Sequence, residues 1–478
     1  MGLSKIIGKL LIRDCAALMA TNRVDSTLQP PPPAPYTLSL TKFPLEIITR
    51  VFEILVELPA PEAYGNVTYV PPLRLGRICR EWREIAWSLP TLWSDVRVII
   101  PSSRDEEQDE NRLKILRGWL ERGRQTLMSV EVLETDMAAR ESTAQVLDLL
   151  RPTSARWQSL NIYAGYPEDL RFDTLQLPFL RRLAMQSTAY GEAEVTTLEF
   201  DSSTFRSVET LLLSRIPTIK ISSTYSLTDI GQNITHIALT DIAVDAVINL
   251  LTYSRHTLVS CRLHYIYLPI EWAWDAPQHH RGWRPETVIV LPHLVTLHLH
   301  QLRVPLRSVL ACLQTPALKE LHLNFGGPET PVHHQLWDES ILGLLTGPKT
   351  LETLEHLVLE SHSLPVDVFT QIVLVCKGLK RMSVYVRNAS ATVILGTLLG
   401  VEESTHFLLR MEYLEYLNWE DRMHDEIILG AVKSRWRCPE AALRGVRFKH
   451  SDRDIVSRVL KTEIEEGLDV KFGFGYDD

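Results

Sequence analysis

The apolar residues of this chain fall into short triplets that recur along most of its length. In each triplet, an apolar residue is followed by apolar residues three and five positions later. Because strand side chains alternate between two faces, the last two positions point to the same side. Each triplet therefore predicts a short strand with one buried face. The triplets are Trp93/Val96/Val98, Leu127/Val130/Val132, Trp157/Leu160/Ile162, Leu180/Leu183/Met185, Val208/Leu211/Leu213, Ile234/Ile237/Leu239, Leu258/Cys261/Leu263, Leu294/Leu297/Leu299, Leu318/Leu321/Leu323, Leu354/Leu357/Leu359, Leu379/Met382/Val384, Leu414/Leu417/Trp419 and Leu443/Val446/Phe448.

Successive triplets start between 23 and 36 residues apart, which is a typical period for a stacked array of repeats. Most intervals contain a helix-like segment, so the pattern predicts an α/β fold: a parallel βα solenoid whose strands bury one face under the helices. The alternative is an ordinary α/β domain with a parallel sheet. We expect the long insertion Glu271–Pro285 to lie as a loop at one edge. The clearest helical segments are Ala243–Leu251, Leu306–Leu313, Ser340–Leu345 and Val366–Val375.

A compact helical pattern precedes the repeats. Pro44 suits the first position of a helix, and an apolar stripe follows at three- and four-residue intervals. A second helix is predicted from Leu73 to Trp87, and Pro90 closes it. The stripe of the first helix consists of Ile48, Val51, Phe52 and Leu55.

The chain therefore divides into three predicted parts. Residues 1–40 carry an N-terminal helix and then the proline-rich linker Pro30–Pro35. The helix is either basic and amphipathic at a membrane surface, or a transit peptide, or simply a frayed or packing helix. Residues 41–93 form the helical module, and residues 94–478 form the repeats. The polar segment Ser102–Asn111 is expected to be a solvated loop or the start of a helix.

Composition narrows the range of functions. The 478 residues include 50 Lys and Arg against 59 Asp and Glu, giving a net charge of −9, which disfavours a nucleic-acid partner. No apolar run reaches the roughly 18 residues typical of a transmembrane segment. The six cysteines are widely spaced, so they indicate neither a zinc motif nor a disulfide framework. We therefore expect a reduced, intracellular compartment, cytoplasmic or nuclear.

Three sequence motifs in the helical module resemble a known family. Phe43–Ile48 followed by Val51-Phe52 resembles the start of an F-box, with Phe43 in place of the usual leucine. Leu75-x-x-Ile78-Cys79-Arg80-x-Trp82-x-x-x-Ala86 resembles its second half, and Pro90-x-Leu92-Trp93 resembles its end. The resemblance covers about 50 of the 478 residues, and the loop Leu58–Pro72 is longer than in a minimal F-box. Such a long loop is common in F-box-like fungal proteins. The triplets resemble leucine-rich repeats of an irregular subtype, because the usual asparagine after each strand is missing.

The resemblance implies a role in protein recognition. F-box proteins bind the adaptor of an SCF-type cullin–RING ubiquitin ligase, and their repeats hold a protein target for ubiquitination. Trp82 and Ile85 also have a purely structural interpretation, as the small core that holds the helices together. The residues that the resemblance assigns to the adaptor contact or its support are Pro44, Leu45, Ile48, Ile78, Cys79, Trp82 and Trp93.

Target recognition in such a solenoid is expected on the concave strand face, opposite the buried positions. His298 and His322 occupy the same position in successive repeats, and so are expected to be lateral neighbours. We expect no metal or other cofactor there, because the matched positions offer two histidines without a carboxylate or thiol. The other histidines, His279, His280, His293, His300, His333 and His334, are expected to be solvated. The predicted target-binding residues are His236, Arg262, His298, Glu320, His322, His356, Arg381, Tyr416, Asn418 and Arg447.

No catalytic motif is present. The sequence lacks a phosphate-binding G-x-x-x-x-G-K-[ST], a G-x-S-x-G elbow and an H-E-x-x-H zinc helix. The expected function is a non-enzymatic substrate-recognition subunit of an SCF ligase, with the adaptor, the cullin complex and an unknown protein target as partners. The alternative is a leucine-rich-repeat scaffold without a link to ubiquitination, in which the helical module only caps the array.

Overall fold

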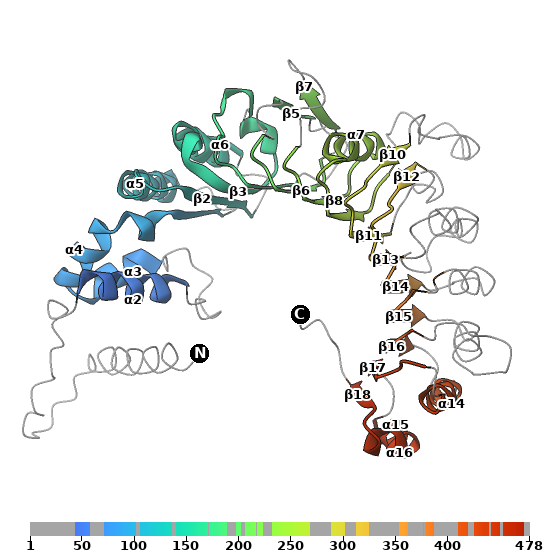
Figure 1. Cartoon of the computed structure of the whole chain (residues 1–478). Coiled ribbons are helices and arrows are strands. Elements are labelled where there is room, and N and C mark those ends of the chain that lie inside the picture. Colours follow the sequence, from blue (N-terminus) through green and yellow to red (C-terminus); the bar gives the residue numbers. More distant parts are fainter. Residues whose placement is uncertain are drawn as a thin grey trace, which may run out of the picture. The chain divides into compact units, whose positions relative to one another are not determined.

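The computed structural model describes two compact units (Figure 1). The first comprises Met1–Ile99 and Asp105–Ser129, and the second comprises Ile100–Arg104 and Val130–Asp478. The N-terminal helix, the proline-rich linker and the insertion at 271–285 lie outside the described residues. The described residues are 44–57, 71–101, 106–135, 140–170, 172–188, 197–201, 206–216, 218–222, 232–267, 288–301, 312–324, 353–361, 376, 378–386, 410–418, 425–438, 441–449 and 453–472.

The first unit is mainly helical. Its first helix begins directly after Pro44, whose carbonyl accepts hydrogen bonds from the Ile47 and Ile48 amides. Ile48 and Phe52 are buried on one side of this helix, as the apolar stripe predicts. Within the polar segment 102–111, residues 106–111 form the start of a long helix. The elements are α2 (Leu45–Glu57), α3 (Pro71–Ile78), α4 (Arg80–Ser88), the 3-10 turn η2 (Pro90–Trp93), β1 (Asp95–Ile100) and α5 (Glu106–Arg122).

The prediction of a single helix from Leu73 to Trp87 is wrong, because the helix is interrupted at Cys79. Cys79 is extended (φ −156°, ψ 173°), and its thiol accepts a hydrogen bond from the Trp82 amide at 3.4 Å. It therefore caps α4 as serine or aspartate would. The Arg83 guanidinium also donates to the Gly76 carbonyl at 2.7 Å, which fixes the two short helices against each other.

Trp93 lies at the centre of the first unit. Its side chain is fully buried, and the indole N–H donates to the Ala86 carbonyl at 2.9 Å. The Trp119 indole donates to the Trp93 carbonyl at 3.0 Å, and the two rings meet edge to face at 4.8 Å. Trp93 thus joins α4 to α5. Because α5 belongs to the same compact unit, this unit extends beyond the end of the F-box resemblance at Trp93.

The second unit is built on a long, open sheet of parallel strands. Among the described residues one sheet has 14 strands in the order β1-β2-β3-β4-β6-β8-β9-β11-β13-β14-β15-β16-β17-β18, and the strands from β3 onward belong wholly to the second unit. The strands after β1 are β2 (Met128–Glu134), β3 (Trp157–Ala164), β4 (Arg182–Ser187), β6 (Thr210–Ser214), β8 (His236–Thr240), β9 (Ser260–His264), β11 (Thr296–His300), β13 (Glu320–Asn324), β14 (His356–Ser361), β15 (Arg381–Val386), β16 (Tyr413–Asn418), β17 (Gly445–Lys449) and β18 (Asp469–Phe472).

The buried positions of the triplets align across neighbouring strands. One row runs through Leu297, Leu321, Leu357, Met382, Leu414 and Val446, and a second row runs through Leu299, Leu323, Leu359, Val384, Tyr416 and Phe448. Every residue in the two rows is nearly inaccessible to solvent. This alignment confirms an α/β fold with a long parallel sheet, in which each strand contributes the same positions to one continuous core.

Two predicted triplets are wrong in detail. Leu127 is exposed, and the adjacent Met128 takes the buried place at the start of β2. In β16, pairing with β15 and β17 places Leu414 second in its triplet, so the buried residues are Met411, Leu414 and Tyr416. Because the side-chain period of a strand is two, this shift moves Tyr416 from the predicted open face into the core.

Helices cover the buried face of the sheet. The predicted helix Ala243–Leu251 is confirmed by α7 (Val244–Ser254), in which Val247, Leu250 and Leu251 are buried. Figure 1 draws α6, α7 and α14 on the same side of the strands. The other predicted helices lie outside the described residues, apart from Cys312 and Leu313, and Leu313 begins β12. The remaining helical elements are α6 (Arg140–Leu150), η4 (Arg151–Arg156), η5 (Pro167–Leu170), η6 (Phe172–Thr174), α14 (Asp425–Trp436), α15 (Arg453–Val459) and α16 (Lys461–Glu465).

A left-handed turn follows four of the strands. Arg215, Asp241, Tyr265 and Gln301 come directly after β6, β8, β9 and β11, with φ between 46° and 57°. Each donates its backbone N–H to the last residue of the next strand, at 2.6 to 3.1 Å. Non-glycine residues rarely adopt this conformation, so the lateral hydrogen bond must offset the strain.

Two small parallel sheets accompany the long one. They pair β5 (Thr197–Asp201) with β7 (Thr218–Ser222), and β10 (Ile289–Val290) with β12 (Leu313–Gln314). Within the described ranges, no helix is both long enough and apolar enough to cross a membrane.

Candidate functional site

The predicted adaptor-binding residues divide into exposed and buried groups. Pro44, Leu45, Ile78 and Cys79 are exposed on the first unit. Ile48 and Trp93 are buried, so they support the module from within. Trp82 is half-buried and packs on Phe52 with 4.9 Å between ring centroids, which agrees with its structural interpretation.

The open face of the sheet carries most of the predicted target-binding residues. His236, Arg262 and Arg381 are exposed, whereas His298, Glu320, His322, His356 and Arg447 are half-buried. Tyr416 is buried on the opposite face, so its assignment to the target surface is wrong. Asn418 is the last residue of β16, and its side chain lies outside the described residues. Glu415 takes the open-face position in β16 instead, 3.9 Å from the Arg447 guanidinium.

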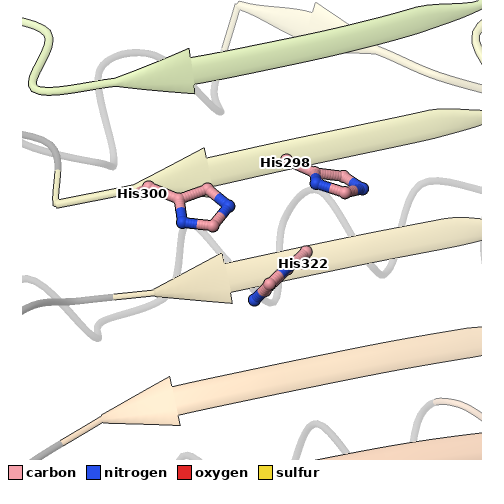
Figure 2. Close-up of side chains that lie close together, drawn as sticks. All are labelled: His298, His300 and His322. Carbon is pink, nitrogen blue, oxygen red and sulfur yellow. The ribbon is translucent and has the colours of Figure 1, made fainter. Parts of the chain in front are cut away.

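Three histidines gather on this face. Figure 2 shows His298 and His300 projecting from β11 toward His322 on β13. His298 and His322 are direct lateral partners with ring centroids 5.1 Å apart, and His300 lies diagonally opposite His322 at 4.5 Å. The side chains offer one potential ligand atom each, all within 4.8 Å of one another. The Nε2 atoms of all three are inaccessible to solvent and make no hydrogen bond.

Burial keeps two of these imidazoles neutral. Loss of solvent, with a smaller contribution from the neighbouring His322, lowers the pKa of His298 and His300 to about 4. At neutral pH both rings therefore carry a free lone pair on one nitrogen. The neutral imidazole is the form that binds metal ions.

Two glutamates flank the histidines on neighbouring strands. The Glu360 carboxylate on β14 lies 3.4 Å from His322 Nε2 and also accepts a hydrogen bond from the Asn324 amide. The Glu320 carboxylate lies 3.8 Å from His298 Nε2 and 3.4 Å from His356 Nδ1. Contact with His356 lowers the pKa of Glu320, despite the opposing effect of burial. The cluster therefore combines three nitrogen ligands with two carboxylates.

Sequence reasoning found part of this cluster and missed the rest. It placed His298 beside His322, as their register now confirms. The expectation that His300 is solvated is wrong, because its side chain is half-buried and its Nε2 atom is inaccessible to solvent. The positions matched to His298 and His322 carry no carboxylate, as expected, but Glu320 and Glu360 approach from neighbouring positions. The run Thr296-Leu297-His298-Leu299-His300 already carried the signal for His300, because alternation puts both histidines on the face opposite the leucines. No such local signal identifies Glu360, which is 38 residues after His322.

No protein-family model matches the sequence, and no curated protein matches it either.

Proposed function

We propose that this chain is a non-enzymatic subunit that selects target proteins for an SCF-type ubiquitin ligase, with its first unit binding the adaptor. The observation that carries the proposal is a set of exposed apolar side chains on the short helices. Leu45, Ile47 and Ile78 are 56%, 53% and 44% exposed. These residues belong to the motifs that resemble an F-box.

Helix-in-groove binding suits these side chains. Complete burial of one leucine or isoleucine side chain contributes about 1.5–3 kcal/mol, so burial of these three against an adaptor groove would favour binding. The interior of the module is already filled by Ile48, Phe52 and Trp93. The exposed residues are therefore available to an adaptor without unfolding of the helices.

The open face of the sheet is proposed to hold the target protein. It combines basic groups, such as Arg262 and Arg381, with the carboxylates of Glu320 and Glu415. This mixture of charges favours a protein over a nucleic acid, whose phosphates require a basic surface. The thiols of Cys79, Cys261 and Cys376 are not in disulfides, which supports the cytoplasm or nucleus as the compartment.

Adaptor binding is tested with the full chain and purified adaptor. We expect a complex at micromolar concentration, weakened at least about tenfold by Leu45→Glu or Ile78→Glu, because a charge would enter the apolar contact. Ile115→Glu is the matched control: Ile115 is 55% exposed on α5 of the same unit. Its substitution should leave binding unchanged. A wild-type chain that fails to bind the adaptor would defeat the proposal and leave the scaffold alternative.

Target capture is tested separately. A chain that carries the adaptor-weakening substitution Ile78→Glu should retain targets that the ligase would otherwise consume, so pull-down from cells identifies them. Charge reversal at Arg262 or Arg381 should reduce their capture while adaptor binding stays intact. If adaptor binding falls together with target capture, the substitution has disturbed folding rather than the target surface.

A further inference from the structure

The histidine cluster on β11 and β13 differs from an ordinary solvated sheet face in the burial of its ring nitrogens. Three Nε2 atoms are removed from solvent without a hydrogen-bond partner. A buried polar atom left without a partner destabilises the folded state, so such atoms are uncommon in native proteins. Here three of them belong to one cluster, and the Glu360 and Glu320 carboxylates lie 3.4 and 3.8 Å from the Nε2 atoms of His322 and His298 without a hydrogen bond, which indicates that a further group completes the site.

We propose that His298, His300 and His322 bind a zinc ion, with the Glu360 carboxylate as fourth ligand. Among the residues that the structure describes, these three histidines have the spacing for a shared metal ion. Tetrahedral zinc with nitrogen ligands at about 2.0–2.1 Å needs neighbouring nitrogens roughly 3.3 Å apart. The present separations are within 4.8 Å, so the side chains must move closer together when the ion binds.

The choice of metal follows from the ligands. Imidazole nitrogen favours zinc and its transition-metal neighbours, whereas calcium and magnesium require oxygen ligands. Three histidines and one glutamate give a complete tetrahedral set, which is typical of a closed site. Glu360 is suitably held for this role, because Asn324 donates a hydrogen bond to its other carboxylate oxygen. Such support orients a metal ligand in advance.

The site would clamp three consecutive strands. His298 and His300 come from β11, His322 from β13 and Glu360 from β14, and these strands are adjacent in the sheet. An ion that binds the folded chain and not the unfolded chain stabilises this part of the sheet. This inference does not rest on the proposed function, since a scaffold and a ligase subunit would use such a clamp equally.

The test is zinc binding to the tag-free full chain by titration calorimetry, with cobalt absorption as a second measurement. We expect one ion per chain with a dissociation constant on the order of 10⁻⁶ M or lower. His322→Gln and His300→Asn should each weaken binding by about 100-fold, and Glu360→Gln by about tenfold. Circular dichroism confirms that each variant is folded.

His236→Gln is the matched control, because His236 lies exposed on β8 of the same sheet. It should bind zinc as the wild type does. The cobalt spectrum should lack the charge-transfer band of a thiolate ligand, which excludes the cysteines as the source. The proposal is overturned if the wild type takes up no stoichiometric zinc, or if the His322→Gln and His300→Asn variants bind as tightly as the wild type.

Discussion

The imidazole of His300 lies 4.5 Å, centroid to centroid, from that of His322 on the neighbouring strand, in an edge-to-face arrangement. The two residues are not direct lateral partners, because His322 pairs with His298 and His300 pairs with Asn324. Diagonal neighbours in a sheet are within reach of long or aromatic side chains. This diagonal contact extends a lateral histidine pair to a group of three.

The same contact predicts an unusual response to substitution. Without metal, His300→Phe should leave the free energy of unfolding unchanged or raise it by about 1 kcal/mol, because it removes an unpartnered buried nitrogen and keeps a ring. Urea denaturation in the presence of a chelator measures this. A loss above about 1 kcal/mol would mean that the His300 imidazole makes stabilising hydrogen bonds. Adding zinc should stabilise the wild type but not this variant.

The close packing around Trp93 leads to a second prediction. A methyl group added at Gly123 would lie 2.8 Å from the Trp93 carbonyl oxygen, a backbone atom that cannot yield easily. Gly123→Ala should therefore reduce the free energy of unfolding by about 1–3 kcal/mol. Gly430→Ala is the control, because a methyl group there meets nothing within 4 Å. In the middle of α14 this change should stabilise the chain by about 0.5–1 kcal/mol. Equal effects in thermal or urea denaturation would contradict the close contact at Trp93.

Most strands could be predicted from the sequence, since an apolar triplet and a strand with one buried face share a period of two. The spacing of the triplets likewise predicted that the strands stack in parallel. The break at Cys79 could not be predicted, because cysteine is not a usual helix cap and the apolar positions run on through it. The contact between Glu360 and His322 could not be predicted either, because it depends on side-chain conformations on two strands that are far apart in the sequence.

The burial of two cysteines gives a third prediction. Loss of solvent raises the pKa of Cys261 and of Cys376 to about 12, so both stay protonated and unreactive in the folded chain. Iodoacetamide at pH 8 should therefore label Cys79, which is exposed, and spare Cys261 and Cys376 until urea is added. Peptide mass spectrometry locates each label. Rapid labelling of Cys261 in the folded chain would contradict its place in the core.

Because of the same thiols, we expect the free energy of unfolding to decline at alkaline pH. Their pKa is about 12 in the folded chain against 9.0 for an ordinary thiol, so between these values the folded state holds more protons. Their stabilising effect is complete below pH 9 and decreases as the pH rises toward 12. Unfolding midpoints measured from pH 8 to pH 10.5 should therefore fall, and Cys261→Ala should reduce the steepness of that fall. A slope that the substitution leaves unchanged would assign the alkaline loss to other groups.

The register of β16 gives the last prediction, because the sequence supports two alignments. Leu414, Leu417 and Trp419 fit the apolar triplet, but so do Met411, Leu414 and Tyr416, and only pairing with β15 and β17 selects the second set. Tyr416 is fully buried, whereas Tyr413 on the same strand is 37% exposed. Tyr416→Ala should therefore cost about 3–5 kcal/mol of unfolding free energy, and Tyr413→Ala about 1 kcal/mol. Urea denaturation of the two variants measures the difference. Similar small losses for both would instead favour the alignment that places Tyr416 on the open face.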